Sequence, residues 1–273
     1  MEPTEQQRHD FLEILWDYYA RQGRGELPWR LPGAGGAFDP YRIMVSEIML
    51  QQTQVTRVIP KYHEFLGLFP NAHALATAEL GDVLRAWQGL GYNRRAKFLW
   101  QAAQIVDNVN QFPTDKQGLV ALPGVGTNTA GAILAYAYNQ PALFVETNVR
   151  SVYIHHFCHD RADVHDKEVL ELLGQTLDRE HPREFYWAVM DYGSYLKATV
   201  GNPGRASKHY AKQSAFHGSR RQIRGQVLRL LGQAHMPLAG LQAVITDERL
   251  RGVLTDLVAE GLVRIDKHGV YSL

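Results

Sequence analysis

LVALPGVGTNTAGAILAYAYNQPALFVETN, residues 119–148, is the stretch of this chain that decides the fold. The run Leu122-Pro-Gly-Val-Gly126 is a short turn between two apolar, helix-like segments. Its glycines permit positive φ angles and a close approach of the backbone to a ligand. The amides that open the following helix favour an anion. Glu146 lies twenty residues after Gly126. The stretch therefore predicts a phosphate-binding turn followed by an acid, as in an enzyme that holds a nucleic acid backbone and acts on its bases.

Composition predicts a soluble intracellular protein. The 273 residues are 45% hydrophobic, which is enough for a buried core in one large or two small domains. The sequence contains no run of 18 apolar residues, so we expect no membrane helix. The first residues, MEPTEQQRHD, do not resemble a signal peptide. Cys158 is the single cysteine, which excludes a disulfide framework and a cysteine metal cage.

The distribution of charge is more informative than its sum, which is +1. No Asp or Glu occurs from Tyr192 to Thr246. The same segment carries Lys197, Arg205, Lys208, Lys212, Arg220, Arg221, Arg224 and Arg229. This basic strip is either a solvated surface or a row of phosphate contacts, as nucleic acid binding requires.

Helical spacing of apolar residues dominates the chain. It covers Ile43 to Phe65, with a break expected at Pro60, and also 80–90, 94–109, 127–138, 170–177 and 185–196. Strand signals are nearly absent before residue 260, so we expect an all-α fold. Residues 200–220 resemble an irregular connector. Three helical segments and a β-hairpin, 262–265 with 270–273, then predict a winged-helix-like module at 217–273 that either binds DNA or packs against a partner.

Several motifs occur in one order and together resemble a known family. This chain is similar to the helix–hairpin–helix DNA glycosylase superfamily of base-excision repair, in particular to its MutY-type adenine glycosylase branch. The resemblance covers residues 10–216 and rests on these motifs: LPWR (27–30), DPYRIMVSEIMLQQTQV (39–55), WQGLGYNRRAKFL (87–99), LPGVGTNTAGAIL (122–134), ETNVRSV (146–152) and MDYGSYL (190–196). It implies a glycosylase domain at 1–216 made of two helical subdomains with an active-site cleft between them. One subdomain joins 1–30 to 140–216, and the other is the helical barrel 31–139.

Breaking a nucleoside N-glycosidic bond requires a proton on the departing base and negative charge near the cationic sugar, as paired carboxylates provide in glycosidases. The resemblance assigns the proton to Glu47 and the negative charge to Glu146, supported by Asn148. Two features leave alternatives open. Glu47 is a structural residue if it caps a helix or pairs with Arg42 or Arg57. Glu146 stands where the family has Asp, and its extra methylene leaves open a protein that binds DNA without cleaving it.

Asn128 occupies the position at which the endonuclease III-like members carry a Schiff-base lysine. An amide cannot act as an amine nucleophile, so the residue predicts hydrolysis by water without strong lyase activity. Thymine glycosylases of G/T mismatches also resemble this chain, and they often carry Tyr at this position.

The resemblance implies a set of DNA contacts. Gln51, Gln52 and Tyr92 match residues that probe or wedge the base stack, which offsets the cost of extruding a base. Arg94 and Arg95 either contact phosphates or lie on a solvated helix face. Further contacts are expected from Leu122, Gly124, Val125, Gly126, Thr129, Lys208 and Lys212. The resemblance also implies a monovalent cation at the hairpin carbonyls near Leu122 and Val125.

Two family features are missing from the sequence. Residues 191–216 lack the four cysteines that hold an iron–sulfur cluster in many members, so we expect no cofactor. Residues 217–273 are too short for the MutY-type domain that recognises 8-oxoguanine. The histidines 155, 156, 159 and 165 lie near Cys158, but we interpret them as a helix-end patch and not as a metal site.

We therefore predict a monofunctional DNA glycosylase, monomeric and acting on duplex DNA, that is either cytoplasmic and nucleoid-associated or nuclear. Its expected substrate is adenine opposite guanine or 8-oxoguanine. The alternatives are a mismatch glycosylase for thymine, uracil or hypoxanthine, and a non-catalytic lesion-binding protein.

Overall fold

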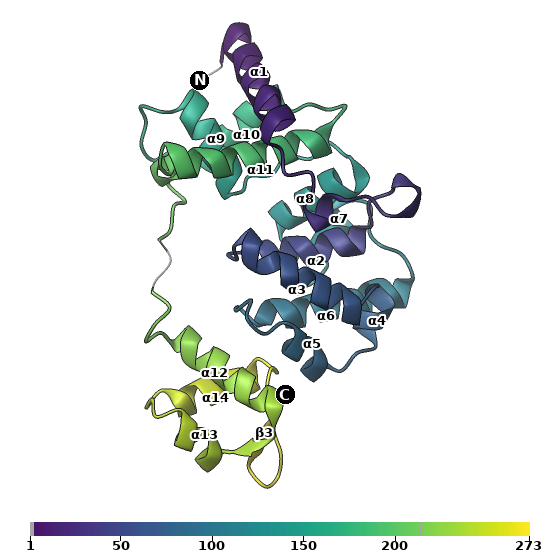
Figure 1. Cartoon of the computed structure of the whole chain (residues 1–273), viewed down its shortest axis with the longest axis vertical. Helices are drawn as coiled ribbons and strands as arrows, with labels where there is room; N and C mark the ends of the chain where they lie inside the picture. Colours follow the sequence, from purple (N-terminus) through teal and green to yellow (C-terminus); the bar gives the residue numbers. More distant parts are fainter. Residues whose placement is uncertain (1–2, 213–214) are drawn as a thin grey trace. The chain divides into compact units, whose positions relative to one another are not determined.

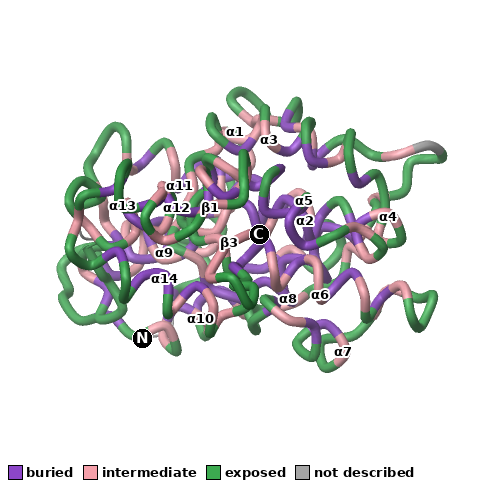
Figure 2. The backbone as a smooth tube through the Cα atoms, turned by 90° about the horizontal axis from the view of Figure 1, so that it is seen from below, coloured by how far each residue is buried: buried purple, intermediate pink, exposed green. Residues whose placement is uncertain are grey.

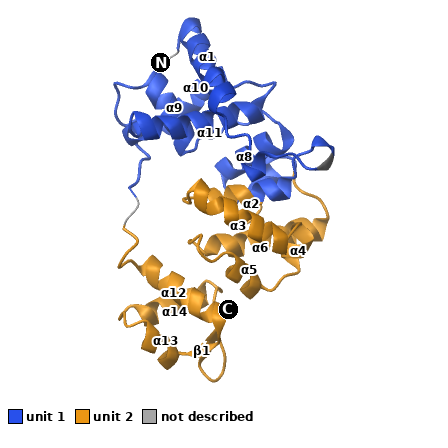
Figure 3. Cartoon of the chain, in the orientation of Figure 1, with its two compact units in different colours: residues 1–44, 114–120, 125–212 blue, residues 45–113, 121–124, 213–273 orange. Residues whose placement is uncertain are grey.

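The computed structural model describes residues 3–212 and 215–273, and its chain divides into two compact units (Figures 1 and 3). Unit 1 consists of residues 1–44, 114–120 and 125–212, and unit 2 of residues 45–113, 121–124 and 213–273. No helix in the described parts of the chain is long and apolar enough to cross a membrane.

Unit 1 is built around two helices, α9 and α11. Its elements are α1 (Glu5–Gln22), the 3-10 turns η1 (Pro28–Arg30) and η2 (Ala34–Gly36), the start of α2 (Pro40–Leu50), α7 (Lys116–Val120), α8 (Thr127–Tyr138), α9 (Thr147–Phe157), α10 (Asp166–Thr176), α11 (Pro182–Thr199) and η3 (Pro203–Ala206). Helix α11 packs against α9, α1 and α8. Phe144 stacks on Tyr186 with ring centroids 4.0 Å apart. The hydrophobic effect of burying these faces holds the unit together.

A buried ion cluster joins the N-terminal segment to α11. Asp191, 2% exposed, accepts hydrogen bonds from both terminal nitrogens of Arg30 at 2.7 and 2.9 Å. Arg24 adds bonds from its backbone nitrogen and its Nε, each 2.8 Å long. Since a buried carboxylate is costly without such partners, this cluster attaches the segment around Arg30 to α11.

Unit 2 contains a helical bundle and the C-terminal module. The bundle consists of the rest of α2 with α3 (Val55–Leu68), α4 (Ala72–Ala76), α5 (Leu80–Ala86) and α6 (Arg94–Val109). The module consists of α12 (Arg220–Gln233), β1 (Met236–Pro237), α13 (Leu238–Val244), α14 (Leu250–Ala259), β2 (Arg264–Ile265) and β3 (Val270–Ser272). Its strands form an antiparallel sheet in the order β1-β3-β2. This succession of helices and strands confirms the predicted winged-helix-like module and the mainly helical fold.

The module packs directly on the bundle. Helix α12 contacts α5, and a Cβ atom added at Gly232 would lie 2.5 Å from Nε2 of Gln88. Buried positions, coloured purple in Figure 2, make up most of α5 and α8, and in α14 they are Leu250, Val253, Leu254 and Leu257.

The bounds of the observed units differ from those of the predicted domains. Residues 217–273 group with the bundle because α12 packs on α5. Residues 31–44, 114–120 and 125–139, predicted in the barrel, group with unit 1, where α8 packs on α11. One local prediction was wrong. The break between α2 and α3 falls at residues 51–54, where Gln52 has a φ of 55°, while Pro60 lies inside α3. The strand β1 was not predicted, because its two residues are too few to leave a periodic signal.

Candidate functional site

The hairpin at residues 121–126 presents backbone amides for binding an anion. Gly124 adopts a φ of 78°, and a Cβ atom there would lie 2.9 Å from Cβ of Phe98, so only glycine fits. Gly126 is the N-cap of α8 and supplies no side-chain cap to the amides that follow. Gly124 and Gly126 are exposed, whereas the side chains of Leu122 and Val125 are buried anchors. A phosphate is the natural partner of such exposed helix N-terminal amides.

The side chain of Thr129 is buried, at 8% exposure, so it can contribute to this amide cradle only through its backbone. The cation expected at the hairpin carbonyls stays a prediction.

Asn128 ties the start of α8 to the segment before Glu146. Its Nδ2 donates to the carbonyl of Val145 at 2.8 Å, and the amide of Val145 donates to its Oδ1 at 3.4 Å. Asn128 therefore aligns the backbone that leads to Glu146, a role that its sequence position did not suggest.

Glu146 begins α9 as its N-cap residue and is half-buried. Burial raises the pKa of its carboxyl group above the ordinary value, and the nearby cations Arg150 and Lys197 lower it in part. Arg150 is already paired, since its Nε and Nη2 each donate to Asp166 at 2.6 Å. The site thus places an acid in a poorly solvated position beside two cations, as is common for catalytic carboxylates.

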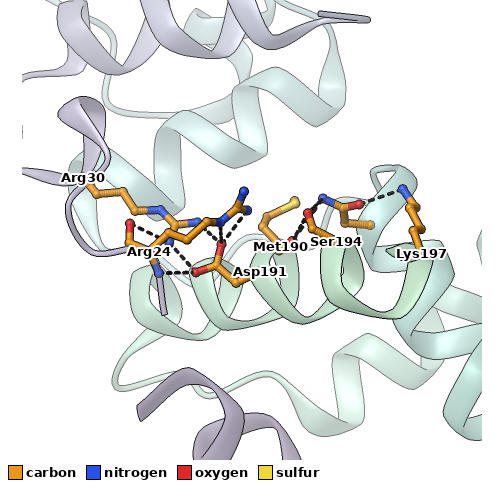
Figure 4. Close-up of polar contacts among 7 residues, drawn as sticks. Arg24, Arg30, Met190, Asp191, Ser194 and Lys197 are labelled. Atoms are coloured by element: carbon orange, nitrogen blue, oxygen red, sulfur yellow. Dashed lines mark hydrogen bonds and ion pairs between the residues drawn. The ribbon is translucent and has the colours of Figure 1, made fainter. Parts of the chain in front are cut away.

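Asn148 is held by α11, and Figure 4 labels its partners Met190, Ser194 and Lys197. Its Nδ2 donates to the carbonyl of Met190 at 3.1 Å and to Oγ of Ser194 at 3.4 Å, and its Oδ1 accepts from Nζ of Lys197 at 2.7 Å. Sequence reasoning placed Lys197 only in the basic strip. A lysine seven residues after the Met of MDYG carries no local signal for this contact.

In unit 2, Glu47 lies on α2 and is half-buried between Ser46 and Ile48, both 0% exposed. The turn that follows contains Gln51, half-buried, and Gln52, exposed with a φ of 55°. A non-glycine residue in the left-handed region marks a turn that the surrounding structure maintains, often for function.

Arg95 maintains this turn together with the neighbouring GLGY turn. Its side chain is buried, at 8% exposure, and its Nη1 and Nη2 bind acceptors in both turns. The acceptors are the carbonyls of Ile48, Met49, Gln51, Leu90 and Gly91 and the hydroxyl of Thr53, at 2.6 to 3.1 Å. The guanidinium of Arg95 is therefore buried against the protein's own carbonyls, and we no longer expect it to contact phosphates. Arg94, the preceding residue, is exposed and stays a predicted phosphate contact.

Tyr92 projects from the GLGY turn with a φ of 47° and is 38% exposed. Nη1 of Arg221 on α12 donates to its hydroxyl at 2.7 Å. Nearby, Nζ of Lys97 donates to the carbonyl of Glu260 at 2.6 Å. The C-terminal module thus touches the turn that carries the predicted wedge residue.

The basic strip has several roles. Arg220 pairs with Asp256 and Arg224 with Glu260 inside the module, so these charges stabilise its own fold. Lys208 and Lys212 are exposed on the connector and remain predicted phosphate contacts.

His156 and His159 line one pocket together with Cys158, and burial lowers the pKa of His156 to about 4. His156 shares a hydrogen bond of 3.1 Å with the Tyr192 hydroxyl. In residues 3–212 and 215–273, the one group spaced to hold a metal is the exposed set His9, Asp10 and Glu13 on α1. With Cys158 as its single cysteine, the chain also cannot provide the four thiolates of an iron–sulfur cluster.

Comparison with known proteins identifies the family. Residues 45–184 match the model of the HhH-GPD superfamily base excision DNA repair proteins. The chain belongs to this superfamily.

Relatives extend the match beyond this region. An adenine DNA glycosylase of Mycobacterium tuberculosis is 36% identical over 97% of this chain and 94% of its own length. The enzyme of the same name from Mycolicibacterium smegmatis is 33% identical over 96% and 95%, and that of Mus musculus 35% over 82% and 44%. The similarity therefore includes the C-terminal module in the two mycobacterial relatives.

Solved structures agree on the fold. A thermostable thymine-DNA glycosylase superposes with a TM-score of 0.62 at 22% identity, over 74% of this chain and 93% of its own. A non-covalent endonuclease III–DNA complex gives 0.61 at 23%, over 72% and 90%.

Proposed function

We propose that this HhH-GPD protein is a monofunctional DNA glycosylase that removes adenine mispaired with guanine or 8-oxoguanine. The observation that carries the proposal is Glu146, a half-buried carboxylate at the start of α9, aligned through Asn128 with the hairpin helix. The relatives called adenine DNA glycosylases at 33–36% identity support adenine as the base.

Glu146 stabilises the cationic sugar that forms as the glycosidic bond breaks, and it orients the attacking water. A carboxylate in a poorly solvated site does this better than one in water, because the solvent screens its charge less. The extra methylene relative to Asp lengthens its reach, and the clasp of Asn128 on Val145 fixes the backbone from which it extends.

Glu47 is the proposed general acid. Its half-buried position on α2 removes part of its contact with solvent, which suits a carboxyl group that acts as a general acid. Protonation of the adenine ring makes the base a better leaving group, and water then completes the hydrolysis.

Duplex DNA is the proposed partner, bound by one copy of the chain. The exposed amides of Gly124 and Gly126 bind a phosphate, and Lys208, Lys212 and Arg94 add positive charge. Tyr92, Gln51 and Gln52 contact the stack from which the base is extruded.

The test is a panel of duplexes bearing A:8-oxoG, A:G, T:G, U:G and hypoxanthine:T, incubated with the protein and then treated with alkali. We expect cleavage of the adenine strands alone, and none without alkali. Cleavage at thymine, uracil or hypoxanthine instead would assign a different base. Binding without release from any duplex would indicate a lesion-binding protein.

The absence of lyase activity needs a separate measurement, because Lys197 places an amine near Glu146. Borohydride traps a Schiff base as a covalent protein–DNA adduct. We expect no adduct, and an adduct that disappears in Lys197→Met would show that this lysine attacks the sugar.

A further inference from the structure

The last turn of α11 places a lysine on the proposed catalytic apparatus. Nζ of Lys197 donates to Oδ1 of Asn148 at 2.7 Å, while Met190 and Ser194 accept from the Nδ2 of the same amide (Figure 4). An ammonium group only donates and a backbone carbonyl only accepts. The amide of Asn148 is therefore held in a single orientation by partners from one helix.

Backbone packing brings Lys197 to this position. Gly193 lies one turn earlier on α11, and a Cβ atom there would lie 2.8 Å from both Cβ and the carbonyl oxygen of Asn148. Only glycine allows the two helices to approach so closely. Residues four apart lie on the same helix face, so Lys197 necessarily projects toward the start of α9.

The second feature of Lys197 is that it forms none of the ion pairs seen in the described residues. Arg150, the other cation near Glu146, is held in a bidentate pair by Asp166. Lys197 takes part in no ion pair within the described parts of unit 1, and its oxygen partner is the neutral amide of Asn148. Its positive charge thus acts on Glu146 without a carboxylate of its own to neutralise it.

On the basis of the proposed glycosylase function, we propose that Lys197 is a positioning residue for base excision. It fixes the amide of Asn148 and supplies the positive charge beside Glu146, and so acts through these two residues. A displacement of about 1 Å in such a site costs on the order of a hundredfold in rate.

Electrostatics gives this role a readout of its own. The charged and titratable groups around Glu146 are Arg150 on α9, Lys197 and Tyr186 on α11, and Asp166 on α10, which pairs with Arg150. Glu146 must be ionised to stabilise a cation, and Lys197 lowers the pKa of its carboxyl group. Removing that charge raises this pKa, so the acidic limb of the rate profile moves to higher pH.

The experiment measures single-turnover release of adenine from an A:G duplex with saturating protein, between about pH 5 and pH 9. We expect Lys197→Met to slow release by about 10- to 100-fold, to shift the acidic limb upward and to leave the dissociation constant for DNA within a few-fold. Lys197→Arg keeps the positive charge and a hydrogen-bond donor. Its pH–rate profile should therefore have the acidic limb of the wild type, and its rate of adenine release should be close to that of the wild type. Lys167→Met, an exposed lysine on α10, is the matched control and should match the wild type.

Three results would overturn the inference. If Lys197→Met released adenine at the wild-type rate and with the wild-type acidic limb of the pH–rate profile, the inference would be refuted and the proposed function would stand. A loss confined to DNA affinity would make Lys197 a phosphate contact instead. Wild-type protein that releases no base from any duplex would refute the function and this inference together. Should Lys197→Met not fold, as judged by thermal unfolding, Lys197→Gln provides the same comparison with a polar side chain.

Discussion

Replacing Arg95 with methionine is expected to destabilise the protein and to loosen both turns that carry the predicted DNA-probing residues. The buried guanidinium binds acceptors on either side, in the turn after α2 and in the GLGY turn. Burial lowers its pKa to about 10, so it remains a cation at neutral pH. Methionine retains most of the apolar stem but lacks the guanidinium group, whose Cζ lies 5.5 Å from the centroid of the Trp87 ring, and it cannot donate a hydrogen bond.

The magnitude follows from the hydrogen bonds that a methionine side chain cannot make. The two shortest bonds of Arg95 join Nη1 to the carbonyls of Gln51 and Ile48, at 2.6 and 2.7 Å. A hydrogen bond from a charged donor contributes about 1.5–3 kcal/mol, so these two alone represent about 3–6 kcal/mol. Relief from burying a charge offsets part of this cost. We expect Arg95→Met to lower the free energy of unfolding by about 3 kcal/mol.

Urea unfolding followed by circular dichroism measures this difference, with Arg94→Met as the control. Arg94 lies next in the chain but is exposed, so its replacement should cost less than about 1 kcal/mol. If Arg95→Met also cost less than about 1 kcal/mol, the buried guanidinium would not be what holds the two turns. A loss confined to DNA binding would restore Arg95 as a phosphate contact.

Three further predictions concern the two units separately. Gly193→Ala should cost about 1–3 kcal/mol of stability in urea and slow base release, since the new methyl group displaces Asn148; unchanged stability would contradict the packing. Glu146→Gln should abolish release yet raise the midpoint of thermal unfolding at pH 7. Since burial raises the pKa of Glu146, its ionised form costs stability above that pKa, and the gain should shrink as the pH falls through it. Arg221→Ala and Tyr92→Phe should weaken binding of a mispaired duplex non-additively, with a coupling of about 0.5–1 kcal/mol; full additivity would show that their contact has no effect on binding.

Residue types close together in the sequence were enough to predict the hairpin, the main helices and the C-terminal module. The left-handed turn at Gly124 and the uncapped amides after Gly126 follow from residue types within a few positions of one another. Helical periodicity likewise predicted the main helices, and the terminal run of three helices and a hairpin predicted the module. These features depend on the conformational preferences of short segments, which can be read from the residue types of a single sequence.

Contacts between distant segments had to come from the tertiary structure. Arg94 and Arg95 are identical in type and adjacent, yet only the second is buried, because its guanidinium binds acceptors in two turns that are distant from each other in the sequence. Lys197 appeared as one charge in a basic strip, and its contact with Asn148 spans 49 residues. The sequence by itself determined the family and predicted the hairpin and the two acids. The tertiary structure showed which cations hold the fold and which lie near Glu146, since this depends on burial and on partners that no local pattern specifies.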